Sequence, residues 1–232
     1  MPGTLYLIPV PIAEGATQTI SPEVISITRN LQHYVAENAR TARRILRSWH
    51  SDLVLEPIAF SEIDKHTGPD KKQLQAWLNA GLNVGLMSEA GCPAIADPGS
   101  ELVAIAHKCG AIVKPLTGPS SIILALMASG LGGQYFAFWG YLPIKNPERR
   151  ERIKMLETFS RKEQQTQIFI ETPYRNAAIM ADLIAFCQPE TKLCIAQNLS
   201  SDQEKIKMRS IAEWKKTGEI PGKEPAVFLL KA

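Results

Sequence analysis

The sequence has little cysteine and no cysteine pattern that would hold a metal ion or a disulfide framework. Its 232 residues include four cysteines, none in a C-x-x-C pair: Cys92, Cys109, Cys187 and Cys194. The four histidines do not cluster with them, so we expect no metal site. Cys109 and Cys194 lie in apolar runs typical of buried free thiols, which argues against disulfides.

Long hydrophobic runs are also missing. The N-terminal stretch MPGTLYLIPVPI is apolar, but it has no basic region and is interrupted by Pro2, Pro9 and Pro11. We therefore expect neither a signal peptide nor a membrane span, and a cytoplasmic location. A net charge of +3 permits a nucleic-acid partner without requiring one.

Several common nucleotide-binding and catalytic motifs are absent. No G-x-G-x-x-G follows the first apolar stretch, and neither G-x-x-x-x-G-K-[ST] nor G-x-S-x-G occurs anywhere. These absences argue against a Rossmann dehydrogenase and a P-loop kinase, and the serine elbow of G-x-S-x-G hydrolases is missing too. Internal repeats and low-complexity tracts are likewise absent.

What the sequence does contain is an alternation of apolar strands and helices. In the first half, strands are expected in 4–10, 33–37, 83–88 and 111–116, and helices in 21–31, 38–49, 71–81 and 99–110. This alternation predicts a parallel α/β sheet. The second half adds helices in 121–132, 146–161 and 174–188 and strands in 134–143, 165–172, 191–199 and 224–232. Aromatic residues and threonine become more frequent there, so we expect two domains, 1–116 and 117–232.

Glycine and proline gather in three loops that follow predicted strands. SEAGCPAIADPGS (88–100) follows one strand, and PVPIAEG (9–15) and TGPSS (117–121) follow two others. Parallel α/β sheets bind ligands beyond the carboxyl ends of their strands. Gly91 would let a ligand approach the backbone, and Asp97 would cap the next helix or hold the loop. One such loop can be a plain tight connection, but three favour a binding role.

These segments carry a specific resemblance. SEAGCPAIADPGS, VKPLTGPSSIILALMASGL, FAFWGYLP and IFIETPYRNAAIMADL resemble the tetrapyrrole-methylase-like (class III) S-adenosylmethionine-dependent methyltransferases. The most similar branch methylates a cytidine ribose 2′-hydroxyl of small-subunit ribosomal RNA. YLIPVPI and VAENARTARRIL are also similar to that branch, and the resemblance covers nearly the whole chain in the correct order.

The resemblance implies an α/β fold of two domains, each a mainly parallel or mixed sheet flanked by helices. It places S-adenosyl-L-methionine in the interdomain cleft, held largely by main-chain atoms, and implies a homodimer. Asp97 and Pro98 would shape their loop without touching the cofactor. The implied cofactor-binding residues are Pro11, Ile12, Ser88, Glu89, Ala90, Gly91, Pro93, Ser120, Ser121, Leu142 and Ala196.

Methyl transfer to a ribose hydroxyl benefits from a general base, because the hydroxyl is a poor nucleophile at neutral pH. Glu37 and Glu89 are the candidates, since both fall at predicted strand ends. Each carboxylate has a simpler alternative role, which is to organise a loop or to pair with a nearby arginine.

Arginines supply the candidate RNA contacts. Arg40, Arg43, Arg44 and Arg47 share one face of a predicted helix with no compensating acid, and they would neutralise RNA phosphates or form a solvated face. Arg175 would anchor a phosphate or pair with Glu171. The basic segment 145–154 has interleaved glutamates, so we expect a solvated helix.

Departures from the family pattern leave the acceptor open. Glu89 and Asn38 stand where the family has aspartate, and AQNLSS (196–201) replaces the family's A-R-E-L-T-K. The leading interpretation is an RNA 2′-O-methyltransferase acting on ribosomal RNA or the small ribosomal subunit. The alternatives are a methyltransferase of a tetrapyrrole or other small molecule, and a diverged paralogue that binds cofactor or RNA without turnover.

Overall fold

The chain forms two compact units in a computed structural model that describes residues 1–64 and 67–232. The first unit is Met1–Ser120 and the second is Ser121–Ala232. The division falls inside the TGPSS segment, between its two serines. Each unit has its own sheet and its own hydrophobic core.

The first unit is built on a five-stranded parallel sheet in the order β3-β2-β4-β1-β5. Its strands are β1 (Thr4–Ile8), β2 (His33–Ala36), β3 (Ala59–Glu62), β4 (Val84–Met87) and β5 (Ile112–Pro115). The parallel sheet that the strand–helix alternation predicted is confirmed. The middle strand β4 is buried throughout, which explains its continuous apolar run.

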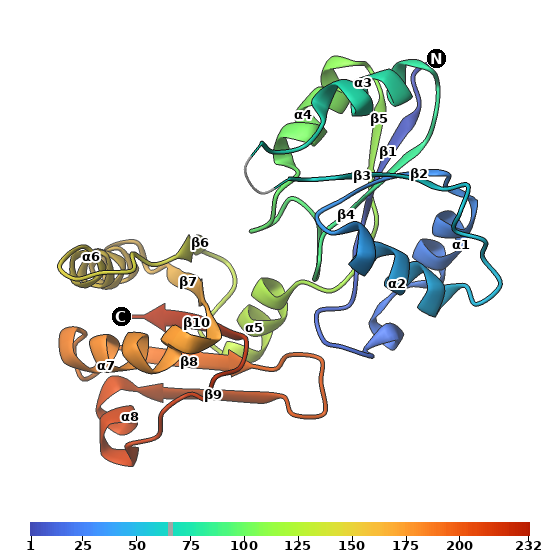
Figure 1. The fold of residues 1–232 in the computed structure, drawn as a ribbon. Coiled ribbons are helices and arrows are strands. Elements are labelled where there is room, and N and C mark those ends of the chain that lie inside the picture. The colour runs from blue at the N-terminus through green and yellow to red at the C-terminus, as the bar shows by residue number, and fades with distance from the viewer. Residues whose placement is uncertain (65–66) are drawn as a thin grey trace. The chain divides into compact units, whose positions relative to one another are not determined.

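Helices cover both faces of this sheet (Figure 1). α1 (Pro22–Asn30) and α2 (Ala39–Trp49) pack on one face with Ile8, Tyr34 and Met87. α3 (Lys71–Asn79) and α4 (Ser100–Lys108) pack on the other face with Leu5, Val35 and Leu86. A short 3-10 helix, η1 (Thr17–Thr19), precedes α1.

Local signals in the sequence set the starts of three of these helices. The side chains of Ser21, Asn38 and Asp70 accept hydrogen bonds from backbone amides of the first turns of α1, α2 and α3, respectively. Asp97 does not cap α4, contrary to one of the two expected roles. Gly99 occupies the N-cap position of α4 with a φ of 129°, and it makes no side-chain cap.

The second unit has a five-stranded mixed sheet in the order β6-β7-β10-β8-β9. Its strands are β6 (Phe136–Tyr141), β7 (Thr166–Glu171), β8 (Lys192–Gln197), β9 (Lys205–Ser210) and β10 (Ala226–Lys231). β6 and β7 are parallel, and β10 is antiparallel to both β7 and β8. Strands β6, β7 and β8 therefore run in the same direction and end at the same edge.

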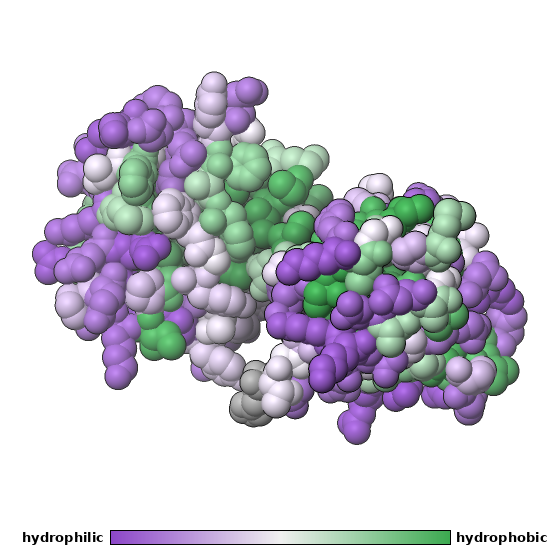
Figure 2. All heavy atoms as spheres, turned by 90° about the horizontal axis from the view of Figure 1, so that it is seen from above, coloured by the Kyte–Doolittle hydropathy of each residue, from purple (hydrophilic) through white to green (hydrophobic). Residues whose placement is uncertain are grey.

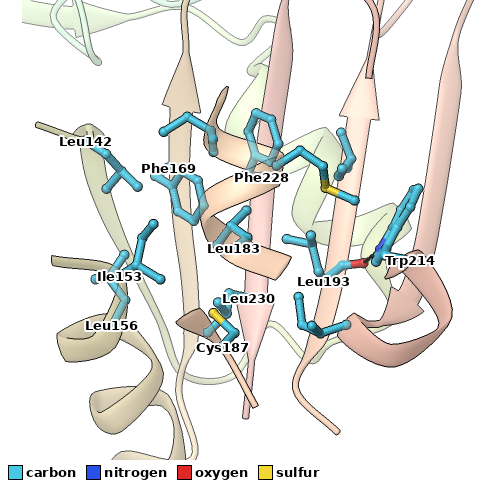
Figure 3. Packing of buried hydrophobic residues seen from close by; sticks show 14 of the residues in the cluster. Leu142, Ile153, Leu156, Phe169, Leu183, Cys187, Leu193, Trp214, Phe228 and Leu230 are labelled. Carbon is cyan, nitrogen blue, oxygen red and sulfur yellow. Dashed lines mark hydrogen bonds between the residues drawn. The ribbon is translucent and has the colours of Figure 1, made fainter. Parts of the chain in front are cut away.

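One face of the second sheet carries the main core of the unit (Figure 3). Residues of α6 (Glu148–Glu163), α7 (Asn176–Phe186) and α8 (Ile211–Thr217) pack there against the sheet. Phe169 and Phe228 stack with ring centroids 5.4 Å apart. The indole of Trp214 donates a hydrogen bond to the Leu193 carbonyl, which satisfies its buried N–H. α5 (Ser121–Ser129) contacts β8, β9 and β10.

Two strands and one α-helix were not expected from the sequence. β3 is only partly buried and β9 carries three basic residues, so neither shows the apolar run of an interior strand. α8 begins with a capping box of Ser210 and Glu213, a signal that was available and was missed.

The structure also describes the state of the cysteines and the character of the surface. All four cysteines are free, with Cys187 and Cys194 buried and Cys92 and Cys109 half-buried. Within the described residues, no helix is both long and apolar enough to span a membrane. Hydrophilic side chains cover much of the face shown in Figure 2, and hydrophobic residues are confined to patches.

Candidate functional site

The carboxyl ends of all five strands of the first sheet lie at one edge, because the sheet is parallel. Ile8 of β1 is paired with Met87 of β4, and Ala36 of β2 is also paired with Met87. The loops 9–15, 88–99 and 116–120 therefore start from neighbouring strands at this edge. These are the three glycine- and proline-rich segments identified in the sequence.

Direct contacts join the three loops. Val10 and Gly91 exchange two backbone hydrogen bonds of 2.9 and 3.1 Å. A Cβ added to Gly118 would lie 2.1 Å from the Cβ of Pro9, so these two residues pack backbone against ring. The Cys92 thiol lies 3.3 Å from the Pro119 carbonyl oxygen. The three loops therefore converge within this unit.

The connections that leave these strands diverge. β1 leads to α1 on one face of the sheet, whereas its neighbour β4 leads to α4 on the opposite face. Such a reversal between adjacent parallel strands opens a crevice at their carboxyl ends, where α/β proteins bind ligands. In the first unit, the connections that follow β1 and β4 change from one face of the sheet to the other at the convergent loops.

The expected cofactor-binding residues of the first unit all lie in or beside these loops. Ser88, Gly91 and Pro93 are buried, and Glu89 and Ala90 are exposed. Pro11, Ile12 and Ser120 are half-buried. Within the described residues, the amides of Ile12 and Ala90 donate to no protein acceptor, so both can serve a ligand.

Three carboxylates surround the start of the 88–99 loop. The Glu37 carboxylate accepts a hydrogen bond of 3.2 Å from the Glu89 amide, and the Glu89 carboxylate accepts one of 3.3 Å from the Thr41 hydroxyl. Burial, and then the negative charge of Glu37, raise the pKa of Asp97 to about 6. In the part of the chain that the structure describes, none of these three acids forms a salt bridge.

Sequence reasoning missed that Asp97 belongs with the other two acids. It assigned Asp97 to the shape of the loop, whose start is held by the Ser88 hydroxyl donating to the Ala90 carbonyl at 3.2 Å. The electrostatic contact of Asp97 with Glu37 joins positions that are sixty residues apart in the chain. The available signal was weak: Glu37 directly follows β2, and Asp97 lies in the loop after β4, the neighbour of β2 in the sheet.

The arginine face of α2 is exposed at all four positions, Arg40, Arg43, Arg44 and Arg47. The expectation that no acid compensates this face is wrong at one position, because Arg44 lies 3.9 Å from the carboxylate of Glu14. Both side chains of that pair are largely exposed, so the interaction is weak. Arg43 stacks over the ring of Phe60 at 4.5 Å. The face keeps most of its positive charge.

Asn38, which replaces a family aspartate, has a structural role. Its side chain accepts a hydrogen bond of 3.0 Å from the Thr41 amide and so caps α2. The Glu62 carboxylate accepts a second bond, of 3.1 Å, from the Ala39 amide. The first turn of the arginine helix is therefore held by two side chains.

In the second unit, the remaining predicted residues lie at the edge where β6, β7 and β8 end. Leu142 follows β6, Arg175 lies in η2 (Pro173–Arg175) after β7, and Ala196 is the penultimate residue of β8. The side chains of Leu142 and Ala196 are buried. Arg175 pairs with Glu171 at 2.7 Å, which was the alternative to anchoring a phosphate. Ser121 begins α5.

The divergent AQNLSS segment is occupied by internal contacts. The buried Gln197 side chain donates to the Glu224 carboxylate at 2.9 Å, and the Asn198 amide donates to the Pro225 carbonyl. Asn198 has a φ of 52°, which asparagine tolerates better than most residues. The segment thus builds the turn after β8. Among the described residues no group of three or more His, Cys, Asp or Glu could hold a metal ion.

Curated relatives cover most of the chain. A protein named Ribosomal RNA small subunit methyltransferase I from Synechocystis is 32% identical over 88% of this chain and 70% of its own length. Its namesake from Bacillus subtilis is 30% identical over 95% of this chain and 73% of its own length. The Escherichia coli O157:H7 protein of that name is 30% identical over 99% and 78%.

Solved structures share the fold at low identity. The methyltransferase CobJ has a TM-score of 0.63 and 15% identity, covering 99% of this chain and 94% of its own. Uroporphyrin-III C-methyltransferase from Thermus thermophilus, complexed with S-adenosylhomocysteine, has a TM-score of 0.58 and 16% identity, covering 99% and 97%. The family model for Tetrapyrrole (Corrin/Porphyrin) Methylases matches residues 4–214. This match covers most of the chain, so the chain belongs to the tetrapyrrole methylase family.

Proposed function

We propose that this protein is an S-adenosylmethionine-dependent methyltransferase that modifies small-subunit ribosomal RNA at a ribose 2′-hydroxyl. The observation that carries the proposal is similarity over almost the whole chain to proteins named Ribosomal RNA small subunit methyltransferase I. The tetrapyrrole methylases among the solved structures share the fold, but identities of 15–16% give no information about the substrate. We therefore rank a tetrapyrrole or other small acceptor second.

The convergent loops of the first unit suit a methyl donor. Gly91 and Gly118 let the loops pack closely together, and the amides of Ile12 and Ala90 are available to a ligand. The donor supplies a methyl group already activated by its sulfonium. We assign to it the main chain of Pro11, Ile12, Ser88, Glu89, Ala90, Gly91 and Pro93, with Ser120, Ser121, Leu142 and Ala196 as further contacts.

The carboxylates of the first unit provide the base. As the methyl carbon leaves sulfur and bonds to the ribose oxygen, the hydroxyl proton must be removed. Glu89 is the more direct candidate, because its carboxylate is exposed and has only the Thr41 hydroxyl as a hydrogen-bond donor among the described residues. Glu37 already accepts the Glu89 amide and therefore orients that residue.

Radiolabelled methyl transfer to isolated small ribosomal subunits tests this function. We expect label in RNA, recovered as a 2′-O-methylated nucleoside after digestion. Glu89→Gln should reduce kcat by about 100-fold or more, as general-base loss does. The matched control is Glu101→Gln, an exposed acid in the same unit. Label that enters only a small acceptor would favour the second candidate, and donor binding without any transfer would favour a paralogue that has lost turnover.

The exposed arginine face of α2 supports an RNA acceptor. RNA contacts to phosphates release counterions, so each lost contact lowers the slope of log affinity against log salt by about 1. Arg47→Ala and Arg40→Ala should each weaken RNA binding and reduce this slope. The control Arg161→Ala removes an exposed charge from α6 in the other unit. Unchanged slopes for both α2 variants would show that the face is only solvated.

We further propose that the protein acts in the cytoplasm, where ribosomal subunits are, and that it does so as a homodimer. The resemblance to the family is the support for both statements. Analytical ultracentrifugation of the purified chain tests the second: sedimentation at the monomer mass of 25.6 kDa at micromolar concentration would contradict it.

A further inference from the structure

The turn that follows β6 is held by two arginines through three successive carbonyl groups. Arg175 donates from Nη2 to the carbonyl oxygens of Leu142 and Pro143, at 3.1 and 3.0 Å. Arg149 donates from Nη1 to the carbonyl oxygen of Ile144 at 2.7 Å. We call residues 142–144 the β6 turn. The two arginines reach it from different elements, η2 and the first turn of α6.

A carboxylate anchors each arginine in turn. Glu171, the last residue of β7, lies 2.7 Å from Nη2 of Arg175, and its side chain is 0% exposed. Asp182, on α7, lies 2.5 Å from Nε of Arg149, and these two side chains are only 12% and 15% exposed. The basic segment was expected to be solvated, and Arg149 corrects that expectation.

Such an arrangement is costly for a surface turn. Charges removed from water are stable only when well paired, and a turn needs no ionic support to connect a strand to a helix. Burial raises the pKa of Glu171 above its ordinary value, which reflects that cost. Two desolvated ion pairs for a three-residue turn indicate that its conformation matters beyond connectivity.

The β6 turn can offer a ligand its main chain. The Leu142 side chain lies in the core beside Phe169 (Figure 3) and is 3% exposed, so only its main chain can contact a ligand. Ile144 is 70% exposed, and the turn therefore passes from core to surface within three residues. The arginines hold the three carbonyl groups of the β6 turn in place. The backbone amides of the same turn are held in one orientation as a result.

We propose that Arg149 and Arg175 are positioning residues for the methyl donor, which act by holding the β6 turn in the conformation that contacts it. This inference rests on the proposed function, in which Leu142 contributes to donor binding. Neither arginine touches the donor or the RNA. The Arg175 side chain is only 20% exposed, and its Nη2 already donates to two carbonyls and pairs with Glu171, which leaves it poorly suited to anchor a phosphate.

Arginine-to-lysine variants test the proposal while keeping each charge beside its carboxylate. Both carbonyls and Glu171 contact the same nitrogen, Nη2, which lies one bond beyond the reach of a lysine ammonium. Arg175→Lys therefore keeps a positive charge near Glu171 but loses the carbonyl bonds. We expect the Kd for S-adenosylhomocysteine, measured by calorimetry, to rise about 10-fold, with the KM for small ribosomal subunits within 2-fold of wild type. Arg149→Lys should act in the same direction. The control is Arg150→Lys, an exposed neighbour on α6 that stacks on Phe186.

The outcomes separate this inference from the function on which it rests. A raised subunit KM with unchanged donor affinity would identify Arg175 as a phosphate contact and overturn the proposal. Unchanged donor affinity in both folded variants would overturn it as well, with the wild-type activity intact. Failure of the wild-type protein to bind donor at all would instead defeat the proposed function. If Arg175→Lys does not fold, Arg149→Lys alone decides.

Discussion

The two units treat their acidic residues in opposite ways. In the first unit, Glu37 and Glu89 follow strands β2 and β4, and their carboxylates accept hydrogen bonds but form no salt bridge among the described residues. In the second unit, Glu171 and Asp182 are each paired with an arginine that also holds backbone. The acids therefore remain available for chemistry in the first unit and serve as structural anchors in the second.

The largest expected effect is on the stability of the paired acids. Glu171→Ala would leave Arg175 partly buried without its partner and should lower the free energy of unfolding by about 3 kcal/mol. Glu89→Ala removes an exposed side chain and should change it by less than about 0.5 kcal/mol. Urea unfolding followed by circular dichroism measures both. Equal losses would remove the distinction between the two units.

A smaller effect is expected where the first unit's loops meet. Gly118→Ala would place a Cβ 2.1 Å from Pro9, so the loops must move apart. Overpacking of this kind costs about 1–3 kcal/mol, and donor affinity should fall with it. Gly133→Ala is the matched control, because its nearest neighbour atom would be 3.6 Å away. A tolerated Gly118→Ala with normal donor affinity would show that close loop packing is not required.

The smallest effect concerns Asp97 and pH. Its pKa is about 6 in the folded protein against an ordinary value of 3.8, so the folded state holds this proton more tightly than the unfolded state. Stability from this carboxyl is therefore greatest at low pH and is lost as pH rises through about 6. Asp97→Asn should be more stable than wild type by about 1 kcal/mol at pH 8, allowing for partial exposure, and no more stable at pH 4. Thermal melts across this range measure it, and parallel curves for the two proteins would contradict the shift.

Much of the fold could be predicted because buried parallel strands produce uninterrupted apolar segments, of which 84–87 is an example. The same physics explains what was missed. β3 and β9 lie at the edges of their sheets, where half of each strand meets solvent and the apolar signal disappears. The convergence of the glycine and proline loops was also predictable, because strand ends in a parallel sheet share an edge.

The finer structure of the candidate site was not predictable from local patterns. Asp97 meets Glu37 only because β2 and β4 are neighbours, a pairing that no spacing in the sequence specifies. Arg149 is indistinguishable from Arg150 and Arg152 in sequence, since all three lie among glutamates. Its role depends on Asp182, which a separate helix brings to it.

The position of β10 has a consequence for how the chain matures. This strand is central in the second sheet, yet it comes after every other strand of that sheet in the chain. During synthesis, β6, β7, β8 and β9 must wait for residues 226–231 before their sheet can close, whereas all strands of the first sheet have been made by residue 115. Nascent chains halted before residue 226 should therefore carry a finished first unit and an open, aggregation-prone second one.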